Sequence, residues 1–117
     1  MAPGIISLGS NTLPAAHMQW AAQRLSSLLA GDVRFSRTLW TQDIHHTGIY
    51  YMNRLAAGST SLPVDRLEQM LKDIEAETKR TRETVTLDLD LMLYDGQRYH
   101  EKDWPRPYIQ QLINEIL

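Results

Sequence analysis

The spacing of apolar and polar positions along the chain predicts its secondary structure. Residues 5–8 are a short apolar run that stops at the turn sequence Gly9-Ser10-Asn11, which is typical of a buried strand. From Pro14 onward, apolar residues recur at helical spacing and predict a helix that ends at Ala30. A period of two then predicts two strands, over residues 33–41 and 49–58.

The second half of the chain repeats this order. Helical spacing predicts a helix over residues 63–80, and residues 86–94 alternate in the clearest period of two, before the turn Asp95-Gly96. A short helix is expected over residues 108–117. The resulting order, β-α-β-β-α-β plus a C-terminal helix, is that of a ferredoxin-like α+β fold. We therefore expect an antiparallel sheet with two helices on one face and a second face left open to ligands.

Composition narrows the class of protein. A chain of 117 residues suits a single domain over residues 1–117, and a net charge of −2 offers no basic surface for nucleic acid. The absence of cysteine excludes disulfides, thiolate zinc sites and a cysteine nucleophile. We see neither a signal peptide nor an apolar run long enough for a membrane. The sequence therefore predicts a cytoplasmic protein with no membrane or nucleic-acid partner.

The strand at residues 86–94 carries the most informative motif, Leu87-Asp88-Leu89-Asp90-Leu91. Residues i and i+2 of a strand share a face and lie about 6–7 Å apart, so the leucines face the core and the aspartates face outward. Two such carboxylates can hold hard cations such as Mg²⁺, which water and phosphate oxygens complete. The alternative is an amphipathic strand that simply exposes its polar side. Two points argue against this alternative. Asp is uncommon in strands, and like charges on one face repel each other unless a cation lies between them.

A basic stretch precedes this strand. Lys79, Arg80 and Arg82 stand at the predicted end of the second helix. Cations there stabilise the helix dipole, which explains them without any ligand. Beside a carboxylate pair, the same cluster also suits a clamp for phosphate groups.

Several motifs resemble those of the 6-hydroxymethyl-7,8-dihydropterin pyrophosphokinase (HPPK) family in order and spacing. The Leu-Asp-Leu-Asp run is the most specific of them, and the resemblance extends over almost the whole chain. The matching segments are Ile6 to Asn11, Tyr51-Met52-Asn53, Glu75 with Arg80 and Arg82, Leu87 to Asp90, His100, Arg106-Pro107-Tyr108-Ile109 and Glu115-Ile116.

The resemblance implies a Mg²⁺-dependent transferase of folate biosynthesis. Such an enzyme moves a diphosphate from ATP to 6-hydroxymethyl-7,8-dihydropterin and releases AMP. Asp88 and Asp90 would bind two Mg²⁺ ions and, with Arg82 and Arg106, form the catalytic set. The implied pterin-binding residues are Thr41, Tyr51, Asn53 and Tyr108, and the implied nucleotide-binding residues are Glu75, Arg80, Arg82, His100 and Arg106.

The chain departs from the family before the Leu-Asp-Leu-Asp run. Only Glu83-Thr84-Val85-Thr86 separate Arg82 from Leu87, where the family has a longer loop with a Trp and a Gly-Pro-Arg. This difference predicts slower chemistry or weaker nucleotide binding. Three interpretations follow: an active pyrophosphokinase, a non-catalytic relative that binds a pterin or nucleotide, and an unrelated ferredoxin-like domain with a solvated acidic strand.

Overall fold

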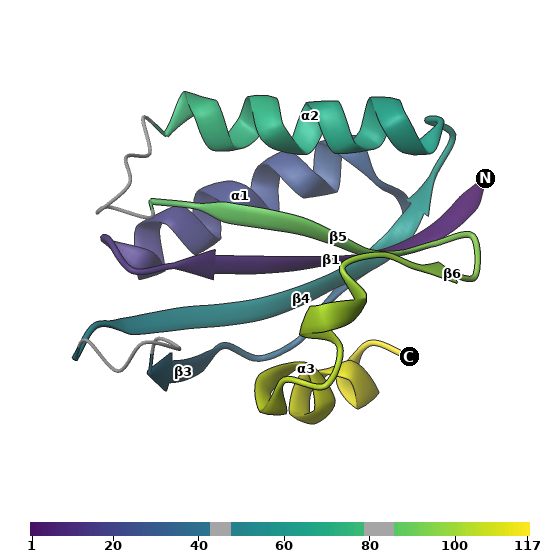
Figure 1. The fold of residues 1–117 in the computed structure, drawn as a ribbon. Helices are drawn as coiled ribbons and strands as arrows, with labels where there is room; N and C mark the ends of the chain where they lie inside the picture. The colour runs from purple at the N-terminus through teal and green to yellow at the C-terminus, as the bar shows by residue number, and fades with distance from the viewer. Residues whose placement is uncertain (43–47, 79–85) are drawn as a thin grey trace.

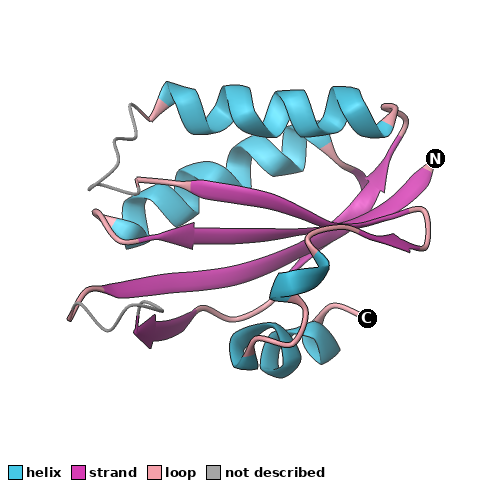
Figure 2. Cartoon of the chain, in the orientation of Figure 1, coloured by secondary structure: helices cyan, strands magenta, loops and turns pink. Residues whose placement is uncertain are grey.

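A six-stranded antiparallel sheet carries α-helices on both of its faces (Figures 1 and 2). The computed structural model describes residues 1–42, 48–78 and 86–117. The elements are β1 (Ala2–Ser10), α1 (Pro14–Leu28), β2 (Ala30–Phe35), β3 (Leu39–Gln42), β4 (Tyr50–Thr60), α2 (Val64–Glu77), β5 (Asp88–Tyr94), β6 (Gln97–Arg98), the 3₁₀-helix η1 (Glu101–Asp103), α3 (Pro107–Leu112) and the 3₁₀-helix η2 (Ile113–Glu115).

The sheet places β1 at its centre. The strand order is β2-β4-β1-β5-β6, with β3 also paired to β4. β1 lies antiparallel to β4 from Ala2 opposite Thr60 to Ser10 opposite Met52, and β5 runs along its other side. This arrangement confirms the predicted ferredoxin-like α+β fold.

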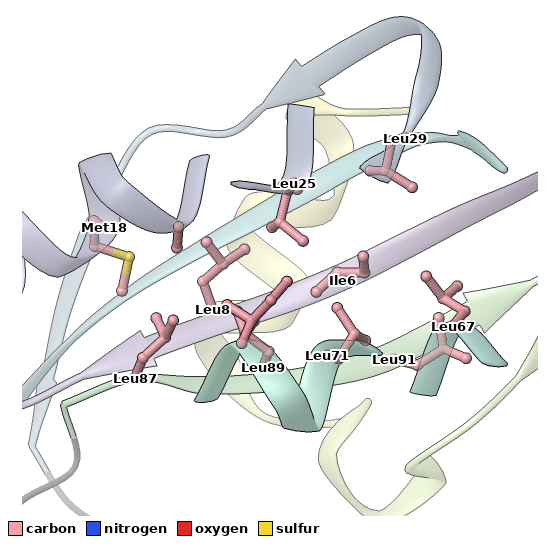
Figure 3. Close-up of a cluster of buried hydrophobic side chains, with 13 residues drawn as sticks. Ile6, Leu8, Met18, Leu25, Leu29, Leu67, Leu71, Leu87, Leu89 and Leu91 are labelled. Carbon is pink, nitrogen blue, oxygen red and sulfur yellow. The ribbon is translucent and has the colours of Figure 1, made fainter. Parts of the chain in front are cut away.

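The first core lies between the sheet and the helices α1 and α2 (Figure 3). Ile6 and Leu8 of β1 and Leu89 and Leu91 of β5 enter it, as the period of two predicts, whereas Leu93 packs against the other core beyond a register shift between Ile5 and Ile6. Full burial of a Leu or Ile side chain contributes about 1.5–3 kcal/mol, so these side chains fix which face of each strand points inward. The largest fully buried members are Ile6, Leu8, Leu25, Leu67, Leu71, Leu87 and Leu91.

The second face of the sheet is less open than the sequence predicts. α3 packs against it and closes a second core, while α1 and α2 lie on the opposite side (Figure 1). The indole nitrogen of Trp104 donates to the carbonyl oxygens of Met92 and Tyr99, 3.1 Å away in each case. The amphipathic C-terminal segment therefore covers half of this face, because the strands offer it an apolar surface. The buried members of this core are Ile5, Leu55, Ala57, Met92, Trp104, Ile109, Leu112 and Ile116.

The strand predicted over residues 33–41 is two strands, β2 and β3, which pair with different parts of β4. Ser36 causes the break. Its hydroxyl accepts the N–H of Leu55 and donates to the carbonyl of Arg37, while the N–H of Arg37 donates to the carboxylate of Glu115. The chain therefore leaves the ladder after Ser36 and rejoins it at Leu39.

Smaller differences concern the ends of elements. The first helix ends at Leu28 and the second at Glu77, and the predicted end at Arg80 lies outside the described residues. The last helix is α only to Leu112 and continues as η2. β6 and η1 are short elements that the pattern did not predict. Among the helices of the described residues, none has the length and apolar character needed to span a membrane.

The break between β2 and β3 generates a stability prediction. Replacing Ser36, which is 1% exposed, with Ala leaves the buried N–H of Leu55 without its acceptor. We expect the free energy of unfolding in urea to fall by about 1–3 kcal/mol. Ser26→Ala, on the exposed face of α1, is the control and should change it by less than about 0.5 kcal/mol. Equal stability of the two variants would contradict this account.

Candidate functional site

Asp88 and Asp90 project from the face of the sheet that α3 half covers. Both are partly exposed, whereas Leu89 between them is 4% exposed and belongs to the first core. The same-face geometry predicted for the two carboxylates is therefore present. Beyond Asp90 the face becomes apolar at Met92, where α3 and Trp104 cover it. The polar end of this face, from Asp90 to the start of β5, is the candidate site.

Gly9 forms the floor between β4 and β5. It lies opposite Asn53 on one side and Asp88 on the other. A Cβ atom on Gly9 would stand 3.6 Å from the amide oxygen of Asn53 and 3.9 Å from the Cβ of Asp88. Because neighbouring strands are about 4.8 Å apart, the Asn53 and Asp88 backbones are about 10 Å from each other. The glycine therefore leaves a shallow space between an amide and a carboxylate.

Asn53 is held in one orientation. Its amide nitrogen donates to the hydroxyl of Thr41 at 2.6 Å and to the carbonyls of Leu39 and Tyr51 at 3.3 Å. The side chain is 6% exposed, and its oxygen lies toward Gly9. An Asn amide has two donor hydrogens and one acceptor oxygen, so the group directed toward the floor of the site is the acceptor. The structure thus places Asn53 in contact with Thr41 and with the backbone of Tyr51, and their role in pterin binding stays a prediction.

Tyr108 reaches the site from α3. Its hydroxyl lies 3.5 Å from that of Ser7, a buried residue of β1 that pairs with Asp90. Burial raises the pKa of Tyr108 above its ordinary value and outweighs the opposing effects of Ser7 and Arg106. The hydroxyl therefore keeps its proton at neutral pH, and the Tyr108 side chain lies beside the strand that carries Gly9.

His100 lies beside the carboxylate pair, and Arg106 lies beside Tyr108 and Asp103. The Nδ1 atom of His100 lies 2.8 Å from the carbonyl oxygen of Leu91, and its Nε2 atom lies 3.8 Å from Asp90 Oδ1. Since Nδ1 must carry a proton to donate to a carbonyl, Nε2 is the ring atom that faces the site. Arg106 stands at the start of α3 with its Nε atom 3.2 Å from Asp103 Oδ1.

Glu75 lies apart from the other predicted nucleotide-binding residues, on α2. Its carboxylate accepts the backbone N–H of Leu89 at 2.6 Å, so it contacts β5 between the two aspartates. The remaining predicted members, Arg80 and Arg82, lie outside the described residues. The contacts of the structure link Thr41 with Asn53, His100 with Asp90, and Glu75 with the backbone of β5. Nine of the eleven predicted site residues lie within the described part of the chain: Thr41, Tyr51, Asn53, Glu75, Asp88, Asp90, His100, Arg106 and Tyr108.

Sequence reasoning missed two polar residues of this site. Ser7 was hidden in an apolar run, although its position two residues before Gly9 places both on one face of β1. Asp103 was overlooked because the turn η1 was not predicted. Its spacing of three residues from Arg106 is the signal that could have indicated an ion pair.

The donor set at Asp88 and Asp90 suits a hard cation. No cluster of three or more His, Cys, Asp or Glu side chains with metal-binding geometry occurs in the part of the chain that the structure describes. Mg²⁺ commonly takes only one or two carboxylates and completes its shell with water and phosphate oxygens. The residues present thus fit Mg²⁺ bound together with a phosphate-bearing ligand.

Comparison with known proteins assigns the chain to a family. A family model described as 7,8-dihydro-6-hydroxymethylpterin-pyrophosphokinase (HPPK) matches residues 5–116. No curated protein matches the sequence. The match includes all of the elements that carry the site, from β1 to the C-terminal helix. The chain therefore belongs to the HPPK family, the pyrophosphokinases of folate biosynthesis.

Proposed function

We propose that this protein transfers a diphosphate from ATP to 6-hydroxymethyl-7,8-dihydropterin and releases AMP. The observation that carries the proposal is the row Asn53-Gly9-Asp88 across three neighbouring strands. It sets a rigid amide oxygen and a carboxylate on either side of a floor without side chains. Two reactants that bind on opposite sides of this floor would meet above β1.

Asp88 and Asp90 would hold two Mg²⁺ ions in this reaction. When bound, these ions neutralise the polyphosphate and hold the attacked phosphorus. Carboxylates alone would repel ATP, so the acidic pair supports a metal-bound rather than a free nucleotide. Nε2 of His100 and the guanidinium of Arg106 would contact the phosphate oxygens, together with Arg82 and Arg80.

The pterin would bind on the Asn53 side of the floor. The oxygen of Asn53 would accept a hydrogen bond from an N–H of the ring, and Thr41 would keep the amide in that orientation. Tyr51 on β4 and Tyr108 on α3 would flank the ring, because flat heteroaromatic rings stack well on aromatic side chains. The ring's hydroxymethyl group would then point toward Asp88.

In this reaction the protein would mainly position the two reactants, and no protein group would form a covalent bond with them. The hydroxymethyl oxygen would attack the β-phosphorus of ATP, the bond to the oxygen bridging the α- and β-phosphorus would break, and AMP would leave with that oxygen. The hydroxyl proton is released. In such transfers the protein aligns the reactants and stabilises charge.

A binding protein that does not turn over is the second candidate. The observation that favours it is the short stretch of four residues between Arg82 and Leu87. Both candidates use the same sheet face and the same metal pair. They differ only in whether AMP appears.

The first functional prediction concerns the metal pair. With Mg²⁺, ATP and 6-hydroxymethyl-7,8-dihydropterin, the protein should release AMP, and Asp90→Ala should lower the rate by about 100-fold or more because charge stabilisation is lost. The variant should remain folded, since Asp90 faces the partly open side of the sheet. Asp73→Ala, an exposed carboxylate of α2, is the control and should leave the rate unchanged.

The outcomes of this assay separate the candidates. Mg²⁺-dependent nucleotide binding without AMP release would favour the binding protein. Unfolding of Asp90→Ala would show that the carboxylate is structural, and it would contradict the proposed metal site.

The second functional prediction concerns Tyr108. Tyr108→Ala should weaken pterin binding by about tenfold, the scale of one aromatic stacking contact, and should change Mg-ATP binding less than twofold. Tyr108→Phe keeps the ring and should retain most of the affinity. Isothermal titration with each ligand measures both effects. An equal loss for the two ligands would argue against stacking.

A further inference from the structure

Along most of the outer edge of β5, side chains form hydrogen bonds with the backbone where a neighbouring strand would otherwise do so. β6 pairs only with Leu93 and Tyr94, so from Asp88 to Met92 no strand of the described residues lies along this edge. Among the described residues, the Trp104 indole donates to the carbonyl of Met92 at the end of this stretch, and two side chains contact the backbone on either side of Asp90. Glu75 accepts the N–H of Leu89, and the His100 ring donates to the carbonyl of Leu91.

The contact with Glu75 stands at the centre of the carboxylate pair. The N–H of Leu89 lies between Asp88 and Asp90 in the chain, and the oxygen–nitrogen distance is 2.6 Å. A hydrogen bond to an ionised carboxylate is shorter and stronger than one between neutral groups. Glu75 comes from a helix whose inner side chains, Leu71 and Ile74, are buried in the first core. The carboxylate of Glu75 is therefore carried by a helix whose position is fixed by the first core.

The direction of both aspartate side chains depends on the peptide units around Leu89. In a strand, the pleat at one residue sets where its two neighbours point. On the inner edge β1 holds β5, but an outer edge without a strand partner is the side on which a β-strand frays. A hydrogen bond to the N–H of Leu89 therefore restrains the separation and direction of Asp88 and Asp90 together.

We infer that Glu75 is a positioning residue for the carboxylate pair and acts on the polyphosphate through the backbone of β5. The inference deepens the proposed function and rests on it. It differs from the role that family resemblance implies, in which Glu75 holds the adenosine part of ATP. The two roles predict different behaviour toward a ligand that has phosphates but no nucleoside.

Inorganic tripolyphosphate is such a ligand. Its Mg²⁺-dependent affinity should fall by about tenfold or more in Glu75→Met and Glu75→Ala, which lack an oxygen acceptor, as for other residues that orient metal ligands. Glu75→Gln retains a carbonyl oxygen at the same reach and should stay within about threefold of the native protein. Titration calorimetry at fixed Mg²⁺ measures all four proteins. If Glu75 acts only on adenosine, ATP binding will weaken while tripolyphosphate binding stays unchanged, and the inference is then wrong.

A matched variant separates positioning from general loss of stability. Leu67→Val trims a buried side chain two turns earlier on the same helix and leaves the Glu75 contact in place. It should lower the melting temperature and keep the tripolyphosphate affinity. If instead Leu67→Val weakens tripolyphosphate binding as much as Glu75→Met at a similar melting temperature, the effect is global and the inference fails.

The proposed function is tested separately by AMP release from the native protein. If that protein binds Mg-tripolyphosphate but releases no AMP, the proposed reaction fails while the Glu75 variants still decide the inference. If it binds no tripolyphosphate with Mg²⁺, there is no polyphosphate site to position, and the inference is overturned whatever the AMP assay gives.

Discussion

Burial of three alternating leucines, in β5 and just before it, is the constraint on which the rest of the site depends. Leu87, Leu89 and Leu91 are each less than 5% exposed in the first core, and each contributes about 1.5–3 kcal/mol when fully buried. A slip of one residue would turn all three toward α3 and would bury both aspartates under α1 and α2. Burial of two unpaired carboxylates costs several kcal/mol more. The hydrophobic core therefore dictates that Asp88 and Asp90 share the outer face, before any ligand is considered.

The C-terminal segment decides how much of that face remains available. Arg34 of β2 donates twice to the carbonyl of Ile116, and Glu115 accepts bonds from the backbone and side chain of Arg37. Together with the bonds from the Trp104 indole, these contacts fix α3 over the apolar half of the sheet. α3 does not extend over the polar part at Gly9, and it contributes Tyr108 to the border of that part. The helix α3 therefore completes the second core and also forms one border of the candidate site.

The limits of sequence reasoning follow from the range of the interactions involved. Periodicity is local, so it located β1, β4, β5, the two main helices and the shared face of Asp88 and Asp90, but it merged β2 with β3 and missed β6. It identified the C-terminal segment as amphipathic but could not tell which surface would receive it. The break at Ser36 depends on a hydrogen bond from the N–H of Leu55. The outer edge of β5 is held by a hydrogen bond from the N–H of Leu89 to the carboxylate of Glu75. Both are contacts between residues distant in sequence, and neither has a local signal. The roles of Arg80 and Arg82 stay predictions.

Binding of a nucleotide and its turnover would need different charged groups at this site. Arg106 is paired with Asp103, and the ring of His100 lies 3.8 Å from Asp90. In the proposed function, Mg²⁺ ions would mediate between these two carboxylates and a polyphosphate. Binding of a metal-bound nucleotide would then depend on β5 and on the contact between Glu75 and the N–H of Leu89. Turnover also needs charge stabilisation at the leaving phosphate, which Arg82 would supply from the sequence between α2 and β5. Under the proposed function, the sheet would therefore provide binding, and Arg82 would decide between binding and reaction.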